Sequence, residues 1–254
     1  MRNIWTIAKR DFLAYFTSPV AYIVLTLLFG MSSFMFYQIL KSFMIQSAAF
    51  QSAQMGQLPS LTDAVANPTL GSINTVLLFV FPLITMRLVA EERKNETLPL
   101  ILTSPITLLE FILGKFLSSL MFLAILLGVS LVYPAILFAY GNPELGPILG
   151  AYLGTLLMVG CYLSIGLLFS AMTDNQLVAA ALTFGASLMF WIISWAAQSA
   201  GSTLGDVLNY LSLINHYQSF ARGTIVSSDV LYFLSFITVG IFLTHRVLDS
   251  YRWR

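Results

Sequence analysis

Gly114 and Lys115 are where the sequence comes nearest to a known catalytic motif. A nucleotide-binding P-loop needs G-x-x-x-x-G-K-[ST], whose glycines let the backbone wrap around phosphates that the lysine then reaches. Leu109 stands where the first glycine would be, so the chain cannot hydrolyse a nucleotide by that route. The sequence also contains no H-E-x-x-H zinc motif and no G-x-S-x-G nucleophile elbow. These absences predict a protein that is not an enzyme.

The two histidines and the one cysteine do not suggest a metal site. His216 and His245 fall on opposite sides of the membrane in the topology that the charges favour, and Cys161 lies inside an apolar segment. A single cysteine excludes an intrachain disulfide and a cysteine-based metal cluster. No Asp, Glu or Lys falls at mid-membrane depth, where ion-coupled transporters usually keep an ionisable group. We expect no metal and no cofactor bound by this chain.

Charge is concentrated in one stretch, EERKNETLPLILTSPITLLEFILGK, residues 91–115. Pro99 is compatible with the first turn of a helix, and Pro105 prevents a helix from running through the residue before it. The LILT between them forms barely more than one turn, for which Asn95 or Thr97 is an available cap. The pattern predicts a short rigid helix with an apolar tip and a charged collar. A solvated connector between two spans explains the spacing equally well.

Thr107 and Glu110 match the T-x-x-E capping box, in which each side chain bonds the other residue's backbone amide. A helix is therefore expected to begin at this point and to continue into the apolar segment that follows.

The composition is that of a membrane protein crossing the bilayer several times. The 254 residues are 58% hydrophobic and 9% charged, whereas soluble domains carry about 25% charged residues. A spanning helix needs about 20 apolar residues, because lipid offers no partner for a free backbone amide. Six segments are long enough, and none shows the alternation of a strand: 20–40, 73–90, 112–140, 148–172, 177–200 and 230–248. We predict an all-α integral membrane protein, with residues 1–254 forming a single transmembrane domain.

The cations predict how the chain is oriented. Ten of the twelve Lys and Arg residues fall on the side of the N-terminus: Arg2, Lys9, Arg10, Arg87, Arg93, Lys94, Lys115, Arg246, Arg252 and Arg254. By the positive-inside rule both termini are cytoplasmic, as is the loop 91–111. The segments 41–72 and 201–228 are then extracytoplasmic. We expect part helix and part flexible loop in the first, and in the second a short amphipathic helix that Asp206 caps and Gly223 ends. The net charge of +1 gives no sign of nucleic-acid binding.

Residues 1–18 read as an interfacial amphipathic helix. Trp5 and Phe12 fall on an apolar stripe, and Lys9 and Arg10 fall opposite it, when residues are placed 100° apart. Such a helix lies on the cytoplasmic membrane surface and contacts lipid headgroups. It would serve as a topology anchor, or would also contact a cytoplasmic partner.

Several stretches resemble the ABC-2-type transporter permeases. EERKNETLPLILTSPITLLEFILGKFL has the acidic pair, basic residue, TSP and GK of that family, although Pro99 stands where an acidic or other helix-forming residue is more usual. RDFLAYFTSPVAYIV near the start and LSLINHYQSFARGTIVSSDVLYFLSF near the end also fit. The resemblance covers nearly the whole chain. It is closest to the gliding-motility-associated permease branch and also similar to permeases encoded beside nitrous-oxide-reductase maturation genes.

The resemblance implies half of a transporter in the bacterial inner (plasma) membrane. A second permease subunit, identical or different, would pair with it, and a separate cytoplasmic ABC ATPase dimer would bind the ATP and Mg. The ATPase-coupling residues would be Glu91, Glu92, Arg93, Lys94, Glu96, Thr97, Leu98, Leu100, Ile101, Thr103 and Ser104. Such a complex would export an undetermined substrate. The alternative is a non-transporting anchor or force transmitter that links an ATPase to an extracytoplasmic partner, for example in gliding machinery.

The resemblance also implies that the first, second and fifth spans form the pathway wall, with Phe34, Asn74 and Phe184 as candidate lining residues. The small residues of the fourth span, such as Gly150 and Gly154, allow close helix approach. They are expected to serve packing within one chain more often than pairing of two chains.

Overall fold

Every regular element that the computed structural model describes, in residues 2–52, 60–103, 105–199 and 201–251, is a helix. The predicted all-α fold is confirmed for this part of the chain. In chain order the helices are α1 (Arg2–Thr17), α2 (Pro19–Ser52), the π-helix η1 (Thr62–Ala66), α3 (Asn67–Thr85), α4 (Ala90–Lys94), α5 (Leu98–Thr103), α6 (Leu108–Ser130), α7 (Val132–Tyr140), α8 (Leu145–Met172), α9 (Gln176–Ser199), α10 (Ser202–Leu211), α11 (Leu213–Ala221) and α12 (Ser227–Ser250).

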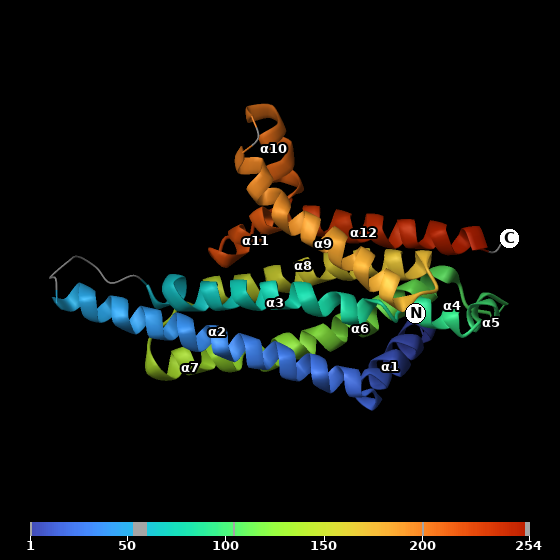
Figure 1. Ribbon diagram of the computed structural model, residues 1–254, viewed down its shortest axis with the longest axis horizontal. Helices are drawn as coiled ribbons and strands as arrows, with labels where there is room; N and C mark the ends of the chain where they lie inside the picture. The colour runs from blue at the N-terminus through green and yellow to red at the C-terminus, as the bar shows by residue number, and fades with distance from the viewer. Residues whose placement is uncertain (1, 53–59, 104, 200, 252–254) are drawn as a thin grey trace.

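Six helical stretches in the described ranges are long and apolar enough to cross a membrane, which confirms the predicted number. They are Ala21–Phe50, Thr62–Lys94, Leu108–Tyr140, Leu145–Met172, Gln176–Ala197 and Ser227–Ser250. Most of them run along the long axis of the molecule (Figure 1). Both termini lie at the end of the bundle that also carries α4 and α5, called here the terminal end.

The helices of the first two spans extend beyond the predicted segments. α2 continues past residue 40 to Ser52, and α3 begins at Asn67 instead of at residue 73. An apolar run indicates which residues lie in the hydrocarbon core of the membrane, whereas a helix ends where a residue interrupts its backbone hydrogen bonds. No Gly or Pro occurs between residues 41 and 52, so the helix continues through polar residues. Of the predicted loop in 41–72, residues 53–59 lie outside the described ranges.

The third span is two helices instead of one. The chain turns at Leu131, between α6 and α7. Pro134 has no amide hydrogen, and its ring would collide with the carbonyl of Ser130 if the helix were continuous. The Leu131 amide bonds back to Gly128 O over 3.2 Å instead.

The segment 201–228 contains two helices, and the expectation that Asp206 caps one helix is wrong. Asp206 lies inside α10, and the chain breaks at Ser212. The Ser212 hydroxyl caps α11 by accepting a hydrogen bond from the amide of Asn215 (3.4 Å). Gly223 lies just after the C-cap residue of α11, as predicted. Its φ of +77° is a backbone conformation that residues with a side chain adopt only under strain. His216 Nδ1 lies 2.7 Å from Asp229 Oδ1 and ties α11 to α12.

α8 is the central helix of the bundle, since α3, α6, α9, α11 and α12 all pack against it. Its glycines allow these approaches. A Cβ at Gly154 would meet Phe220 of α11, one at Gly160 would meet Ile237 of α12, and one at Gly166 would collide with Thr85 of α3. The expectation that these small residues serve packing within one chain is confirmed for α8.

Substituting Gly166 by Val should destabilise the fold, because the new side chain would overlap Thr85 at the crossing of α8 and α3. Overpacking of this kind costs about 1–3 kcal/mol. Thermal unfolding in detergent should show a Tm lower by several degrees. Gly128→Val is the matched control, because nothing lies within 4 Å of a Cβ at Gly128 in α6. Equal Tm values for the two variants would contradict the packing assigned to α8.

Candidate functional site

The charged loop folds into two short helices at the terminal end, α4 and α5, joined by a tight turn (Figure 1). The turn places Glu96 at a φ of +55°, and the amide and hydroxyl of Thr97 both donate to Glu92 O, over 2.9 and 3.2 Å. Pro99 lies in the first turn of α5, as its fixed φ permits. The short helix that the sequence predicted is therefore preceded by a second one, built from the charged residues themselves.

α4 is fixed to the end of α8 by polar contacts with its first turn. Ser170 Oγ accepts hydrogen bonds from the amides of Val89 and Ala90, over 2.9 and 3.0 Å. These are amides that a helix start leaves without intrahelical partners. Arg93 donates to Ala171 O over 2.9 Å, and its guanidinium lies 4.4 Å from the centre of the Tyr251 ring. These contacts connect α4 to the end of α8, and to Tyr251 directly after α12.

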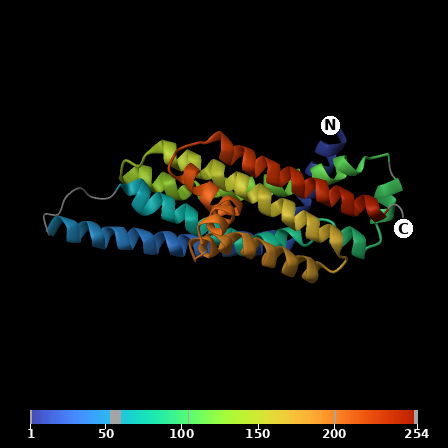
Figure 2. The same ribbon diagram turned by 90° about the horizontal axis from the view of Figure 1, so that it is seen from above.

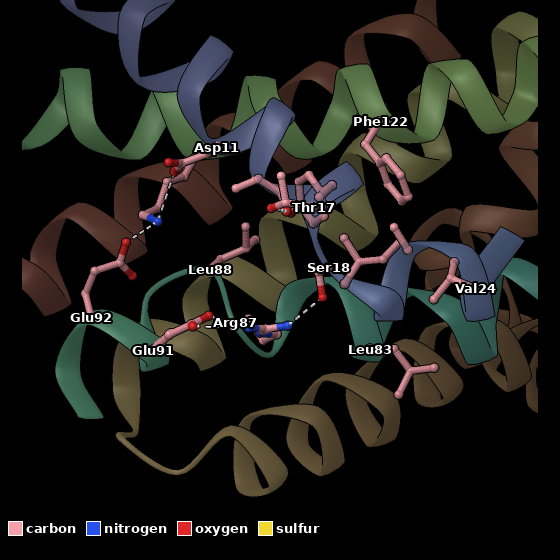
Figure 3. Close-up of a pocket in the computed structure, with 15 residues that line it drawn as sticks. Asp11, Thr17, Ser18, Val24, Leu83, Arg87, Leu88, Glu91, Glu92 and Phe122 are labelled. Carbon is pink, nitrogen blue, oxygen red and sulfur yellow. Dashed lines mark hydrogen bonds and ion pairs between the residues drawn. The ribbon is translucent and has the colours of Figure 1, made fainter. Parts of the chain in front are cut away.

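Lys115 joins three elements through two ion pairs. Its Nζ lies 3.1 Å from Asp11 Oδ2 on α1 and also contacts Glu92 Oε1 on α4. The Lys115 side chain is 5% exposed, and those of Asp11 and Glu92 are 16% exposed. A buried ammonium is tolerated only when carboxylates replace its lost hydration. The contacts around Asp11 and Glu92 are drawn in Figure 3.

A further ion pair, between Arg87 and Glu91, lies beside this cluster. Arg87 makes a two-pronged contact with Glu91, over 3.0 and 3.1 Å, and its Nη1 donates to Ser18 Oγ over 3.4 Å. Ser18 is the break between α1 and α2, so this contact joins the first span to the loop after the second (Figure 3).

A cleft of about 380 Å³ opens between α1, α2, the end of α3, α4 and α6. Asp11, Arg87, Glu91, Glu92 and Lys115 all line it, along with apolar side chains (Figure 3).

Tyr15 closes one wall of the cleft. Its ring stacks on Phe122, with centroids 4.7 Å apart, and its hydroxyl lies 2.9 Å from Ser119 Oγ. Burial raises the pKa of the Tyr15 phenol, which therefore stays protonated.

α1 lies along α6 as well as carrying the predicted polar face. Ile7 and Ala8 are buried, and a Cβ at Gly114 would collide with Ile7. Asn3 reaches the Glu110 carboxylate over 3.2 Å, where Glu110 forms the predicted capping box with Thr107. Of the residues predicted for this helix, Trp5, Lys9 and Arg10 are exposed and Phe12 is half-buried.

The predicted coupling residues divide into two groups. Glu91, Glu92, Arg93 and Thr97 are half-buried in the contacts described above, Leu98 is 6% exposed, and Lys94, Glu96, Leu100 and Thr103 are exposed. Ile101 lies in α5, and Ser104 lies outside the described residues. Most of the charged side chains of the loop therefore hold it to the bundle, and fewer of them surround the tip as the predicted collar would. What projects is α5, with Leu100 70% exposed at its tip.

The three candidate pathway residues differ in their exposure to the outside of the bundle. Phe34 is 58% exposed on α2, and Phe184 is half-buried on α9 against Phe79, with ring centroids 5.5 Å apart. Asn74 is only 6% exposed and lies inside the bundle.

Sequence reasoning missed the roles of Asp11, Lys115 and Ser170. The partners lie far apart in the chain, and only the fold brings them together. The available signal was a lone acidic residue in a basic amphipathic helix and a lysine inside an apolar run.

Comparison with known proteins gives two matches. The family described as ABC-2 family transporter protein matches residues 5–247. The protein described as probable ABC transporter permease protein NosY, from Pseudomonas aeruginosa, is 29% identical over 203 residues, which cover 76% of this chain and 68% of that protein.

Replacing Lys115 by Met should destabilise the chain more than removing either carboxylate. The variant leaves Glu92 without its cation and Asp11 with only the exposed Arg10 as a partner, at a cost of about 3 kcal/mol. Asp11→Asn or Glu92→Gln keeps one ion pair and should cost less. Thermal unfolding of the purified protein measures this order. Arg10→Gln is the control, because the exposed Arg10–Asp11 pair contributes little. If K115M lowered the Tm less than either carboxylate variant, the cluster of Lys115 with Asp11 and Glu92 would be refuted.

Proposed function

This chain belongs to the ABC-2 family of transporter proteins and is a permease subunit, and we propose that it couples ATP hydrolysis by a separate ATPase to the export of a substrate. Members of this family are typically non-catalytic, multi-pass membrane subunits, and ABC permeases pair with ATPase subunits. The observation that carries the proposal is the construction of the α4–α5 loop. α4 contacts α6 through Glu92 and Lys115, and α8 through Ser170, while Lys115 also pairs with Asp11 of α1; the exposed helix α5 follows α4 after a tight turn.

In this proposal α5 seats in the ATPase and transmits its movement. Leu100 offers an apolar contact at the tip, and Lys94, Glu96 and Thr103 surround it with polar groups. Directly beneath, Leu98 packs in a buried cluster with residues of α6, α8 and α12, among them Phe111, Leu167 and Leu248. A displacement of α5 therefore reaches three spans as rigid-body motion.

The terminal end would face the cytoplasm of a bacterial inner membrane, with both chain termini inside. The excess of Lys and Arg at that end supports this orientation. α1 would then lie on the cytoplasmic membrane surface beside the ATPase, and two permease subunits would enclose a pathway. The substrate is open, because an aromatic, uncharged wall suits lipids, peptides and lipid-linked sugars alike. Membership of the gliding-motility-associated branch stays a prediction from sequence resemblance.

A non-transporting force transmitter is the second candidate, and the length of α2 favours it. The 34 residues of α2 make a helix about 51 Å long, whereas the hydrocarbon core is about 30 Å thick. Its far end therefore projects from the membrane, within reach of an extracytoplasmic partner.

Substituting Leu100 by Asp should release the ATPase without disturbing the fold. A carboxylate at the centre of an apolar contact removes a binding hot spot of about 2 kcal/mol, roughly a thirtyfold loss of affinity. Affinity purification of the tagged permease, with ATP hydrolysis assayed in the eluate, measures the effect. Leu145→Asp is the matched control, because Leu145 is similarly exposed but starts α8 at the opposite end of the bundle. ATPase recovery equal to wild type in L100D would refute the assignment of α5.

Reconstitution distinguishes transport from anchoring. Proteoliposomes that contain the permease and its ATPase should move a candidate substrate only with ATP, and not with a hydrolysis-deficient ATPase. ATP turnover without movement of any lipid, peptide or lipid-linked sugar tested would favour the force transmitter.

A further inference from the structure

An apolar groove runs along the outside of the bundle, with α8 as its floor and α9 and α12 as its walls. Its volume is about 410 Å³, and Ile165, Phe169, Phe190 and Val239 are among its lining residues. α9 and α12 both pack on α8 and meet each other where Phe190 touches Phe236, with ring centroids 5.1 Å apart. Figure 2 shows α8 lying between α12 and α9. All three are membrane-crossing helices, so the groove opens to lipid.

The groove contains no polar group in need of a ligand. The hydroxyl of Ser235 donates to Tyr232 O over 2.8 Å, and the hydroxyl of Tyr232 donates to Leu211 O over 2.8 Å. Every other lining side chain that the structure describes is apolar. Binding in the groove is therefore favoured by dispersion contacts and by the burial of apolar surface, and an acyl chain provides both.

One face of α12 carries the groove wall and then a cation. Tyr232, Phe236, Val239 and Leu243 recur at helical spacing along the wall, and Arg246 continues the same stripe one turn further. Arg246 is exposed, its guanidinium lies 5.0 Å from the Phe242 ring, and no ion pair joins it to a carboxylate among the described residues. An apolar stripe that ends in a cation complements a molecule with an apolar tail and an anionic head.

The length of the groove agrees with that of one acyl chain, which extends through about half the thickness of the hydrocarbon core. From Tyr232 to Leu243 the helix rises about 16 Å, and half of the hydrocarbon core is roughly 15 Å deep. Arg246 then lies at the depth of the headgroup phosphates on the side of the terminal end, where a long basic side chain extends to the interface.

We propose that this groove binds one acyl chain of an anionic glycerophospholipid, and that Arg246 binds the phosphate of the same molecule. The lipid would fill the space between α9 and α12 that the chain's own side chains leave open. It would also brace α9, which packs on the rest of the bundle along little of its surface.

Native mass spectrometry of the detergent-purified permease, titrated with phosphatidylglycerol or phosphatidylcholine, tests the proposal. One phosphatidylglycerol per chain should be retained in preference to phosphatidylcholine. Arg246→Gln should weaken phosphatidylglycerol binding about fivefold, the usual effect of one basic residue near an anionic headgroup. Lys9→Gln is the control, because Lys9 is another exposed cation of the terminal end, remote in sequence from the groove.

Filling the groove provides the second arm. Val239→Trp should abolish the retained lipid, whereas Leu234→Trp should not, since Leu234 is similarly exposed on α12 but does not line the groove. Equal retention of the two lipids, or unchanged retention in both R246Q and V239W, would overturn the proposal. So would a change from dimer to monomer in V239W alone, which would identify the groove as a contact between subunits. If V239W does not fold, R246Q against K9Q decides.

Discussion

The cost of burying one ammonium group determines how the terminal end is built. The Lys115 side chain is nearly inaccessible, and Asp11 and Glu92 contact its amine from two other elements, where they replace the hydration that burial removes. Loss of one carboxylate would leave the ammonium with a single ion pair, and loss of both would leave it buried without a counter-charge. The pairing therefore fixes α1 and α4 against α6. α1, the loop that contains α4, and the span that begins with α6 are thereby held together.

Other contacts extend this unit into the bundle. Ser170 binds the first amides of α4, and Arg93 binds the last turn of α8, so the loop also follows the central helix. α8 in turn lies close to its neighbours because glycines replace side chains at the contacts. Through these contacts α4, which precedes α5, is joined directly to α6 and α8. In a permease that takes its energy from a separate ATPase, short stiff connections of this kind are what transmission of force requires.

The sequence predicted what depends on local or average properties. Six spans follow from apolar length, the capping box of Thr107 and Glu110 follows from spacing, and both are confirmed in the described residues. A prediction failed where one residue interrupts the continuous helix that the average hydrophobicity of its segment indicates. Pro134 divides the third span into two helices. The short helix of the charged loop could be predicted, but the inward direction of its charges could not, because their partners lie far away in the chain. Asn74, which looked suitable for a pathway, is inside the bundle.

Pulsed dipolar spectroscopy of the permease–ATPase complex tests the central claim most directly. Spin labels at Lys9 and Asn95, both exposed on the terminal end, report the distance between α1 and α4, and a label at Met44 on the far part of α2 serves as the reference. If Lys115 holds these elements as one unit, the Lys9–Asn95 distance stays the same when ATP binds while the distances to Met44 change. A Lys9–Asn95 distance that shifts by several ångströms with ATP, with the distances to Met44 unchanged, would contradict the account.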